Sequence, residues 1–293
     1  MKIRDRVIGE GPCYVVGEVA QAHEGSVTLA HAYIDAIADA GADACKFQVH
    51  IAEAESTPDE PWRVEPRWKQ DESRYAYWKR LQFSGDQWAE IAGHAWGRGL
   101  AFIVSPFSVE AVELMKPLAD AWKVASGEVT NADLLVAIAA TGGPVIVSSG
   151  MSTYQELEDV RLLFGFKAGV AILQCTTSYP TKAEDVGLGT MLQIGRLYRC
   201  PMGLSDHSGT IFAGLGAAAL GADIIEAHVT LSKDAQGFDT SSSITPAELK
   251  TLVDGVKFLE TARWRVDKDA MAEELAEMRS VFLDKHKRRA SLV

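Results

Sequence analysis

The sequence predicts a single α/β domain built as a (β/α)₈ TIM barrel. Short apolar runs alternate with longer helical patterns, which is the sign of βα units and a parallel sheet. Eight such units in roughly 250 residues match the size and order of a closed barrel. The first strand-like run ends in Glu-Val-Ala-Gln-Ala-His-Glu-Gly, without a GxGxxG fingerprint. This disfavours the doubly wound open sheet, which is the competing fold.

The chain is long and apolar enough to form one large core. It has 293 residues, of which 47% are hydrophobic and 24% are charged, an ordinary globular composition. In chain order, the expected strands are 14–20, 44–50, 101–107, 121–127, 144–150, 170–177, 201–207 and 223–230. The helical patterns that follow them are 27–40, 85–98, 109–116, 132–140, 154–164, 185–198, 210–220 and 246–259.

Two segments fall outside this alternation. Residues 52–82 form a long connection rich in Trp, Tyr, Arg and Glu, and connections of that length are usually functional lids or interface segments. The segment 266–290 is acidic first and basic at 285–289, which is typical of a charged helix with a solvated basic end. We therefore expect a barrel over residues 1–265 and a charged helix or tail over 266–293.

The net charge indicates which partners the protein avoids, and the cysteines indicate the cellular compartment. The formal net charge of −11 argues against nucleic acid or an anionic membrane, because both would be repelled. Cys13, Cys45, Cys175 and Cys200 are widely spaced and form no CxxC pair, which favours packing thiols in a reducing cytoplasm. The sequence contains no stretch of about 18 apolar residues. We expect a soluble cytoplasmic protein that acts on small molecules.

Polar side chains occur near the carboxyl ends of several expected strands, where burial is costly unless they are paired or used. Because side chains alternate along a strand, each strand gathers its polar residues on one face. These sets are Lys46, Gln48 and His50; Gly203, Ser205 and His207; and Glu226, His228 and Thr230. They predict an active site at the carboxyl ends of the strands.

Two histidines suggest a metal site. His207 and His228 lie at the ends of the last two expected strands, which are neighbours in a barrel, with Glu226 and Asp206 nearby. Two imidazoles with oxygen ligands and open water positions suit a divalent metal such as Mn²⁺, Fe²⁺ or Zn²⁺ that polarises a carbonyl. Two core histidines with satisfied hydrogen bonds are the alternative, and the residues leave both open.

Two lysines suggest an anion site. Lys46 and Lys123 lie in the second and fourth expected strands, and Ser126 and Ser148 follow in the same region of the barrel. Ammonium and hydroxyl donors suit a carboxylate or, better, a phosphate, although a lysine at a strand end can also snorkel to solvent. Glu18, at the end of the first strand, could serve as an acid or base with a raised pKa, or could orient a histidine.

Beyond these residues, the chain resembles the sialic acid synthase (N-acetylneuraminate synthase, NeuB-like) family from about Val15 to Leu259. The strings that carry the resemblance are GEVAQAHEG (17–25), GADACKFQVH (41–50), FIVSPFS (102–108), WKVASGEVTN (122–131), VSSGM (147–151), QCTTSYPTKAEDVGLGTM (174–191), GLSDHSGT (203–210) and EAHVTL (226–231). So many strings in one order make a chance match untenable.

The resemblance implies a transferase that condenses phosphoenolpyruvate with the aldehyde of an open-chain sugar, releases phosphate and gives a 3-deoxy-2-keto acid. It implies a divalent metal, Mn²⁺ first and Mg²⁺ as the alternative, and a homodimer. The residues that it assigns to phosphoenolpyruvate are Lys46, Lys123, Ser126, Ser148, Thr177 and Ser205, and those for the metal are His207 and His228. Glu128, Tyr179, Glu226 and Asp239 fall on the acceptor side, and we count Glu18 with them as catalytic.

Several positions depart from the family pattern. The departures are Ala227, where a basic residue is usual; Thr177, where Asn or Ser is common; Ser108, in place of an Asp; and Thr240 after Asp239, in place of a His. The family also continues from an Arg-Ser-Leu-like string into an antifreeze-like domain, whereas this sequence ends at Val293. We therefore expect an acceptor other than N-acetylmannosamine.

Two other functions are compatible with the sequence. A related barrel lyase would cleave a 2-keto acid to pyruvate, and a non-catalytic relative would act as a partner or regulator. The presence of Lys46, Lys123, His207 and His228 disfavours the second, because a protein without catalysis would be free to lose them.

Overall fold

We describe the protein from a computed structural model, which describes residues 1–62, 70–165, 169–263 and 266–290, with side chains placed up to residue 283. The chain divides into two compact units, Met1–Glu260 and Thr261–Val293. The predicted boundary after residue 265 falls beside residues 264–265, which lie outside the described residues, as do the side chains of the basic run 285–289.

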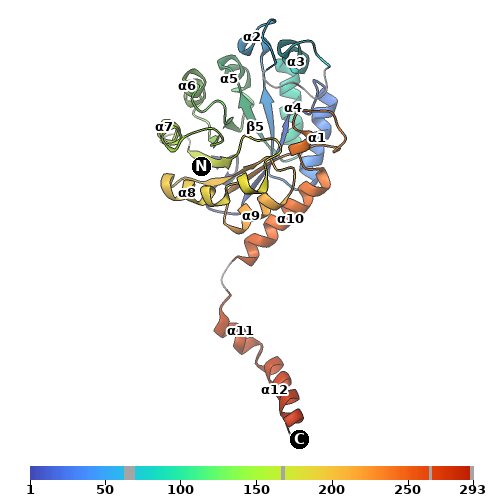
Figure 1. Cartoon of the computed structure of the whole chain (residues 1–293), viewed down its shortest axis with the longest axis vertical. Helices are drawn as coiled ribbons and strands as arrows, with labels where there is room; N and C mark the ends of the chain where they lie inside the picture. Colours follow the sequence, from blue (N-terminus) through green and yellow to red (C-terminus); the bar gives the residue numbers. More distant parts are fainter. Residues whose placement is uncertain (63–69, 166–168, 264–265, 291–293) are drawn as a thin grey trace. The chain divides into compact units, whose positions relative to one another are not determined.

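The first unit is a closed barrel of parallel strands, which confirms the predicted (β/α)₈ fold (Figure 1). Going round the barrel, the strand order is β10-β3-β4-β5-β6-β7-β8-β9. The bounds are β3 (Tyr14–Ala20), β4 (Ala44–Val49), β5 (Ala101–Pro106), β6 (Ala121–Val124), β7 (Val145–Ser148), β8 (Val170–Cys175), β9 (Met202–Asp206) and β10 (Ile224–His228).

A helix follows each barrel strand and covers its outer face (Figure 1). These helices are α1 (Val27–Asp39), α4 (Gly85–Gly97), α5 (Val109–Met115), α6 (Ala132–Thr141), α7 (Tyr154–Phe164), α8 (Leu188–Tyr198), α9 (Phe212–Ala219) and α10 (Pro246–Ala262). Local sequence fixes several starts: Ser84 and Thr153 each form a capping box, with Gln87 and Glu156 respectively. Ser108, one of the departures from the family pattern, caps α5.

All but the first of the expected strands end one to three residues earlier than predicted. The residues beyond each end leave the hydrogen-bonded ladder and turn into loops at the mouth of the barrel. The expected helix 185–198 is also split. A 3₁₀ turn, η1 (Ala183–Asp185), precedes α8 because Gly187 between them has a φ of +75°.

Four short elements were not predicted, because none is long enough to show a period. β1 (Lys2–Ile3) and β2 (Arg6–Val7) pair antiparallel ahead of the barrel. In the long connection 52–82, the structure contains α2 (Ala52–Glu55) and α3 (Arg74–Leu81). Residues 63–69 of that connection lie outside the described residues.

The barrel interior is apolar at one end and polar at the other. Its apolar part is a cluster in which Ile3 and Ile8 pack with residues of the barrel strands: Tyr14, Val16, Ala44, Ala101, Ile103, Ala121, Ile146, Ala171, Leu173 and Ile224. Two residues further along the same faces lie Glu18, Lys46, Lys123, Ser148, Ser205 and Glu226, all buried. Parallel strands bring these polar side chains to one mouth of the barrel, where the active sites of this fold lie.

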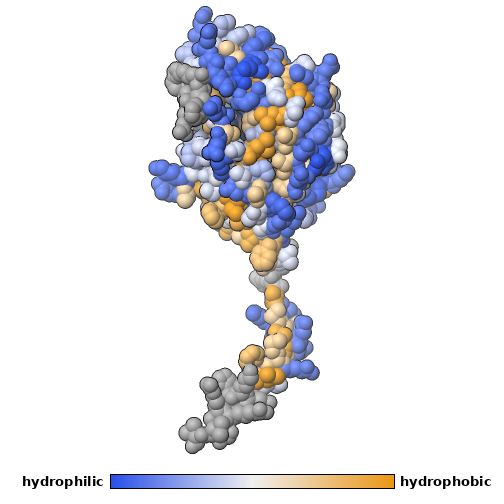
Figure 2. All heavy atoms as spheres, turned by 90° about the vertical axis from the view of Figure 1, so that its right-hand side faces the viewer, coloured by the Kyte–Doolittle hydropathy of each residue, from blue (hydrophilic) through white to orange (hydrophobic). Residues whose placement is uncertain are grey.

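The second unit contains two helices, α11 (Lys268–Glu274) and α12 (Ala276–Ala290), separated by a turn at Leu275, where one charged helix or tail was expected. Met271, Leu275, Met278 and Phe282 are exposed and recur at helical spacing. Figure 2 shows hydrophobic and hydrophilic residues side by side on the surface of this unit. No helix in the described part of the chain is both long and apolar enough to cross a bilayer.

Candidate active site

A buried carboxylate holds two lysines together at the barrel mouth. Glu226, on β10, accepts hydrogen bonds from Lys123 Nζ at 2.9 Å to each of its two oxygens. Lys46 Nζ lies 3.4 Å from Glu226 Oε1, and Ser205 Oγ donates to the same oxygen at 3.0 Å. Because all four side chains are at most 4% exposed, their charges interact across a medium that screens them much less than water does. The two lysines that sequence analysis placed in separate strands therefore form one cluster.

Glu18 lies on the other side of Lys46. Its Oε2 is 2.9 Å from Lys46 Nζ, and its Oε1 accepts a hydrogen bond from Gln48 Nε2 at 3.2 Å. The strand register explains the contact, because Glu18 of β3 is paired with Lys46 of β4 on one side and with His228 of β10 on the other. Glu18 thus connects the lysine cluster to the histidines.

The two carboxylates of this cluster have opposite pKa shifts. Burial raises the pKa of Glu226, but the ammonium groups of Lys123 and Lys46 outweigh burial and hold it well below its ordinary value. Burial raises the pKa of Glu18 to about 7, against the opposing effect of Lys46. Glu226 is therefore ionised at neutral pH and is suited to orient the lysines. Glu18 is the group suited to exchange a proton.

The Glu18→Gln variant is expected to change how stability depends on pH. The folded protein keeps the Glu18 proton up to a pKa of about 7, above the ordinary value of 4.5. Ionisation of Glu18 therefore opposes folding. The stability that protonated Glu18 contributes is lost as the pH rises from 4.5 to about 7. As the pH rises from 4.5 to about 7, the unfolding free energy of the wild type should fall by at most about 3 kcal/mol relative to that of Glu18→Gln. Denaturant unfolding of both proteins across this range measures the difference.

Exposed Glu113 on α5 offers the matched control for that comparison. Glu113→Gln removes the same charge where water already solvates it, and its unfolding curve should track that of the wild type at each pH. A wild type that gains stability over Glu18→Gln as pH rises would contradict the raised pKa of Glu18.

The two predicted metal ligands lie beside each other. The His207 and His228 rings are 5.1 Å apart between centroids, and both side chains are buried. His207 Nδ1 donates to the Thr176 carbonyl at 3.0 Å, which leaves Nε2 as the nitrogen that can bind a metal. Burial lowers the pKa of His207 to about 4 and that of His228 well below its ordinary value. Both rings are thus neutral at physiological pH, as metal binding requires.

This arrangement suits a metal that takes only part of its ligands from the protein. Among the described residues, no group of three or more His, Cys, Asp and Glu side chains is arranged to hold a metal ion. His207 and His228 would fill two positions and leave the others to water and substrate, which is the ligand pattern of an open catalytic site. Asp206 does not join them, contrary to expectation. Its carboxylate lies on the other face of β9 from Ser205 and accepts hydrogen bonds from the backbone and the hydroxyl of Ser208.

Small residues line the side of the mouth formed by β6, β7 and β8. Ser148 Oγ is buried and has no hydrogen-bond partner among the described residues, as expected of a donor that awaits a ligand. Ser126 Oγ lies 3.1 Å from Thr177 Oγ1. A Cβ on Gly150 would come within 2.3 Å of Ser126 Cβ and 2.5 Å of Thr177 Oγ1. Glycine is therefore required at this position for the two hydroxyls to meet.

The Gly150→Ala variant is expected to destabilise the protein by about 1–3 kcal/mol, because the new methyl group must displace Ser126 or Thr177. Gly93→Ala on α4 is the matched control. A Cβ at Gly93 meets nothing within 4 Å, so alanine there should stabilise the helix by up to about 1 kcal/mol. Thermal unfolding of both variants measures the two effects. Equal melting temperatures would contradict the close packing around Gly150.

Of the remaining predicted residues, Tyr179 and Asp239 lie beside the histidines and Glu128 lies near the start of α6. Tyr179 stacks on His207 with ring centroids 4.3 Å apart, and its hydroxyl is 3.4 Å from His207 Nε2. Asp239 Oδ2 is 3.8 Å from His228 Nδ1, and burial raises the pKa of Asp239 to about 6. Glu128 instead accepts a hydrogen bond from Asn131 Nδ2 at 2.7 Å, beside the start of α6.

A chain of hydrogen bonds supports Glu18, and sequence analysis missed most of it. Gln48 Oε1 accepts from Gln21 Nε2 at 3.3 Å and lies 3.4 Å from His50 Nε2. His50 Nδ1 is in turn 2.6 Å from Glu55 Oε2. Gln48 and His50 had been noted for sharing a strand face with a lysine. Gln21 lies in a loop and Glu55 ends the short helix α2, and neither segment has a period that marks a side chain's direction. A polar residue just past a barrel strand was the one available signal for Gln21.

Fold and site together define a (β/α)₈-barrel protein with a buried lysine–carboxylate cluster beside two neutral histidines at the carboxyl ends of its strands. Residues 33–268 match the model of the NeuB family, and the chain belongs to this family.

Curated relatives and a solved structure agree with this assignment. The chain is 32% identical over 274 residues to human N-acetylneuraminate-9-phosphate synthase, covering 92% of this chain and 76% of that protein. It is 32% identical over 256 residues to N,N'-diacetyllegionaminic acid synthase of Campylobacter jejuni, covering 85% and 76%. The solved sialic acid synthetase of Leptospira borgpetersenii, in complex with citrate, superposes with a TM-score of 0.82 at 29% identity and covers 96% of both chains.

Proposed function

We propose that this protein condenses phosphoenolpyruvate with an aldehyde, releases phosphate and forms a 3-deoxy-2-keto acid of the nonulosonate type. The observation that carries the proposal is the pair of buried lysines, Lys46 and Lys123. Both contact Glu226 on β10, the strand that also carries His228. An anion site and a site for a Lewis acid at one barrel mouth suit a reaction that joins an enol phosphate to a carbonyl.

Phosphoenolpyruvate would bind at the lysine cluster. Lys46 and Lys123 carry two positive charges against the carboxylates of Glu226 and Glu18. Because Glu18 has a pKa of about 7, it can take up a proton as the anionic substrate arrives, and the cluster then becomes positive. The hydroxyls of Ser205, Ser148, Ser126 and Thr177 would supply further donors to the phosphate and carboxylate oxygens. The unpartnered hydroxyl of Ser148 is the strongest support for this assignment.

A divalent metal, Mn²⁺ first and Mg²⁺ as the alternative, would be held by His207 and His228 and would polarise the aldehyde carbonyl. Carbon 3 of the enol phosphate then forms a bond to the aldehyde carbon, and the aldehyde oxygen takes a proton. Glu18 is placed to deliver that proton, because its pKa of about 7 lets it hold a proton near neutral pH. It contacts Lys46, and on β3 it is paired with His228 of the neighbouring strand β10. Water adds at carbon 2 and returns one proton to Glu18. The bond from carbon 2 to the phosphate oxygen then breaks, and phosphate leaves with the second proton as the keto group forms.

The acceptor would lie toward Tyr179 and Asp239, which lie beside His207 and His228 respectively. Glu226, assigned to this side by resemblance, has its contacts with Lys123, Lys46 and Ser205. We therefore propose that Glu226 positions the lysines. Glu128, bonded to Asn131, would reach the acceptor only from the rim.

Incubation with phosphoenolpyruvate, Mn²⁺ and a panel of aldehydes tests the proposal. We expect phosphate release that needs both metal and aldehyde, and a product heavier than the aldehyde by the added three-carbon acid in mass spectrometry. Formation of pyruvate from a 2-keto acid, without condensation, would favour the lyase alternative. Bound metal and phosphoenolpyruvate without turnover would contradict the synthase, and absence of metal-dependent binding in calorimetry would favour a non-catalytic relative.

The homodimer and the cytoplasmic setting stay predictions. Light scattering on the purified chain would test the first, and cell fractionation the second.

A further inference from the structure

A buried histidine, His50, lies at the outer end of the hydrogen-bond chain that reaches Glu18. Its ring stacks on Trp78 of α3, with centroids 3.7 Å apart and an interplanar angle of 15°. It also stacks on Phe107, just after β5, at 4.1 Å and 19°. Two rings cannot occupy one face at these distances, so His50 is sandwiched between them. Both ring nitrogens of His50 are therefore fixed at the edge of the sandwich, where each needs a partner of its own.

The first nitrogen faces a carboxylate. His50 Nδ1 is 2.6 Å from Glu55 Oε2, and both side chains are 6% exposed. The other oxygen, Glu55 Oε1, accepts a hydrogen bond from the backbone N–H of Ile51 at 2.8 Å. An ionised carboxylate only accepts hydrogen bonds, so the proton of this short contact belongs to Nδ1.

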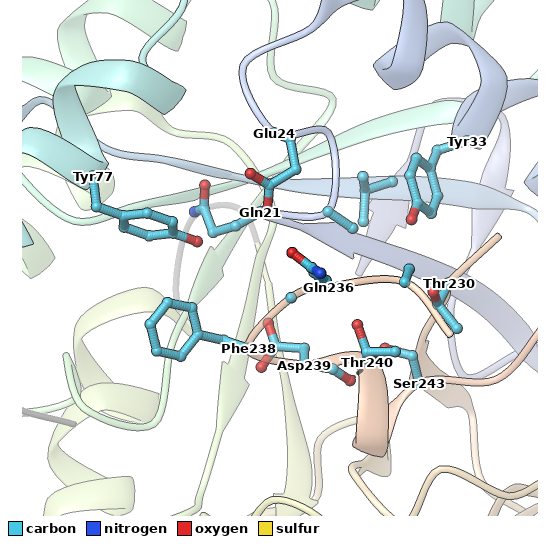
Figure 3. A pocket seen from close by; sticks show the side chains of 14 residues that line it. Gln21, Glu24, Tyr33, Tyr77, Thr230, Gln236, Phe238, Asp239, Thr240 and Ser243 are labelled. Carbon is cyan, nitrogen blue, oxygen red and sulfur yellow. Dashed lines mark hydrogen bonds between the residues drawn. The ribbon is translucent and has the colours of Figure 1, made fainter. Parts of the chain in front are cut away.

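The second nitrogen also faces an acceptor. His50 Nε2 lies 3.4 Å from Gln48 Oε1, which accepts from Gln21 Nε2 at 3.3 Å, while Gln48 Nε2 donates to Glu18 Oε1 at 3.2 Å. Gln21 lies in the lining of a cleft that also contains Asp239 (Figure 3). A ring with its only proton on Nδ1 would turn a lone pair toward Gln48 Oε1, and the two acceptors would repel each other. A second proton, on Nε2, removes this conflict.

The surroundings of His50 suit a positive charge. The faces of an indole and a phenyl ring attract a cation, and Glu55 supplies the opposite charge. Burial, reinforced by His50, lowers the pKa of the nearby His23 to about 3, so His23 stays neutral. The guanidinium of Arg74, 5.5 Å from the indole ring, is paired with Glu60 at 2.8 Å. The one charge in direct contact with His50 is thus a negative one.

We infer that Glu55 and His50 are positioning residues of the candidate active site, in which the doubly protonated ring of His50 fixes the Gln48 amide with its N–H toward Glu18. This inference rests on the proposed function, in which Glu18 exchanges a proton. With the amide reversed, Gln48 would present its carbonyl oxygen to Glu18, and the carboxyl group would lose the donor that holds it. His50 thus acts on Glu18 through Gln48.

Nitrogen NMR of the full chain, labelled in its histidine rings, tests the charge of His50 without any need for activity. We expect one histidine with protons on both ring nitrogens at neutral pH, whose signals disappear in His50→Phe. In Glu55→Gln, where no carboxylate faces Nδ1, the same histidine should carry a single ring proton. A His50 ring with one proton in the wild type would overturn the inference, whatever reaction the protein catalyses.

Kinetics test the positioning role. His50→Phe keeps the aromatic sandwich but donates no hydrogen bond, so kcat for condensation should fall by about 10- to 100-fold as Glu18 loses its fixed orientation. Because the anion and metal sites are left intact, KM for phosphoenolpyruvate and Mn²⁺ affinity should stay at wild-type values. His94→Phe is the matched control, since His94 also stacks on a ring and bonds a carboxylate, that of Asp35. Its kcat should equal that of the wild type.

Glu55→Gln provides a second variant if His50→Phe does not fold. It should lower kcat by less, because the ring keeps one proton. Glu53→Gln, at an exposed position of the same helix α2, is its control and should leave kcat unchanged. Wild-type kcat in a folded His50→Phe or Glu55→Gln variant would overturn the inference alone. No condensation by the wild type would overturn the proposed function and the positioning role with it.

Discussion

Replacement of Lys123 by methionine is expected to lower the condensation rate by about 100- to 1000-fold, the usual cost of losing one donor to a reacting oxyanion. Lys123 is buried and donates to both oxygens of Glu226 at 2.9 Å. It would therefore present its remaining donor to a substrate in a setting from which water is largely excluded. Titration calorimetry with phosphoenolpyruvate and steady-state kinetics measure the loss of binding and of rate.

Stability has to be separated from binding in that experiment. Lys123→Met leaves the Glu226 carboxylate buried with fewer partners, which is expected to cost about 3–5 kcal/mol. Adding Glu226→Gln removes that charge and should restore much of the stability without restoring phosphoenolpyruvate binding. Lys116→Met, at the exposed end of α5, is the control for loss of a lysine. Unchanged phosphoenolpyruvate affinity in a folded Lys123→Met variant would remove Lys123 from the proposed anion site.

The second large effect is expected from His207→Asn and His228→Asn. Each variant removes one of the two imidazoles that would hold the metal, so Mn²⁺ affinity should fall by at least about 100-fold, and turnover with it. The signal of free Mn²⁺ in electron paramagnetic resonance measures binding without any need for activity.

His94→Asn is the matched control for the histidine variants. His94 lies on α4, where it bonds Asp35 at 2.9 Å and stacks on His31, far in the sequence from the site. Its replacement should leave Mn²⁺ binding as in the wild type. Full Mn²⁺ affinity in both His207→Asn and His228→Asn would contradict the assignment of the metal to this pair.

The order of secondary structure could be predicted from the sequence because each barrel strand is a short apolar run that contrasts with the helix after it. Only the ends of these strands were misplaced. Gly127 and Gly150 were expected inside strands, yet they belong to loops at the barrel mouth. Periodicity cannot detect the residue at which a ladder ends, since an extended loop residue and a strand residue have similar composition.

The site was predicted best where residues lie on the strands themselves. Alternation along β4, β9 and β10 correctly grouped Lys46 with Gln48, Ser205 with His207, and Glu226 with His228. It also showed that Asp206 has the opposite parity, so its orientation toward Ser208 could have been anticipated. Gln21, in a loop, and Glu55, in the short helix α2, gave no such signal.

The sequence by itself determined the barrel and the set of polar side chains at its mouth, because a two-residue period and the rule of parallel strands place them there without knowledge of packing. Only the tertiary structure decided how these side chains pair. Glu226 could have faced the histidines or the lysines, and it contacts Lys123, Lys46 and Ser205. Closure of the barrel makes that choice, since it brings Lys46 of β4 and Lys123 of β6 across the interior to Glu226 of β10, and a sequence read one strand at a time does not contain these contacts.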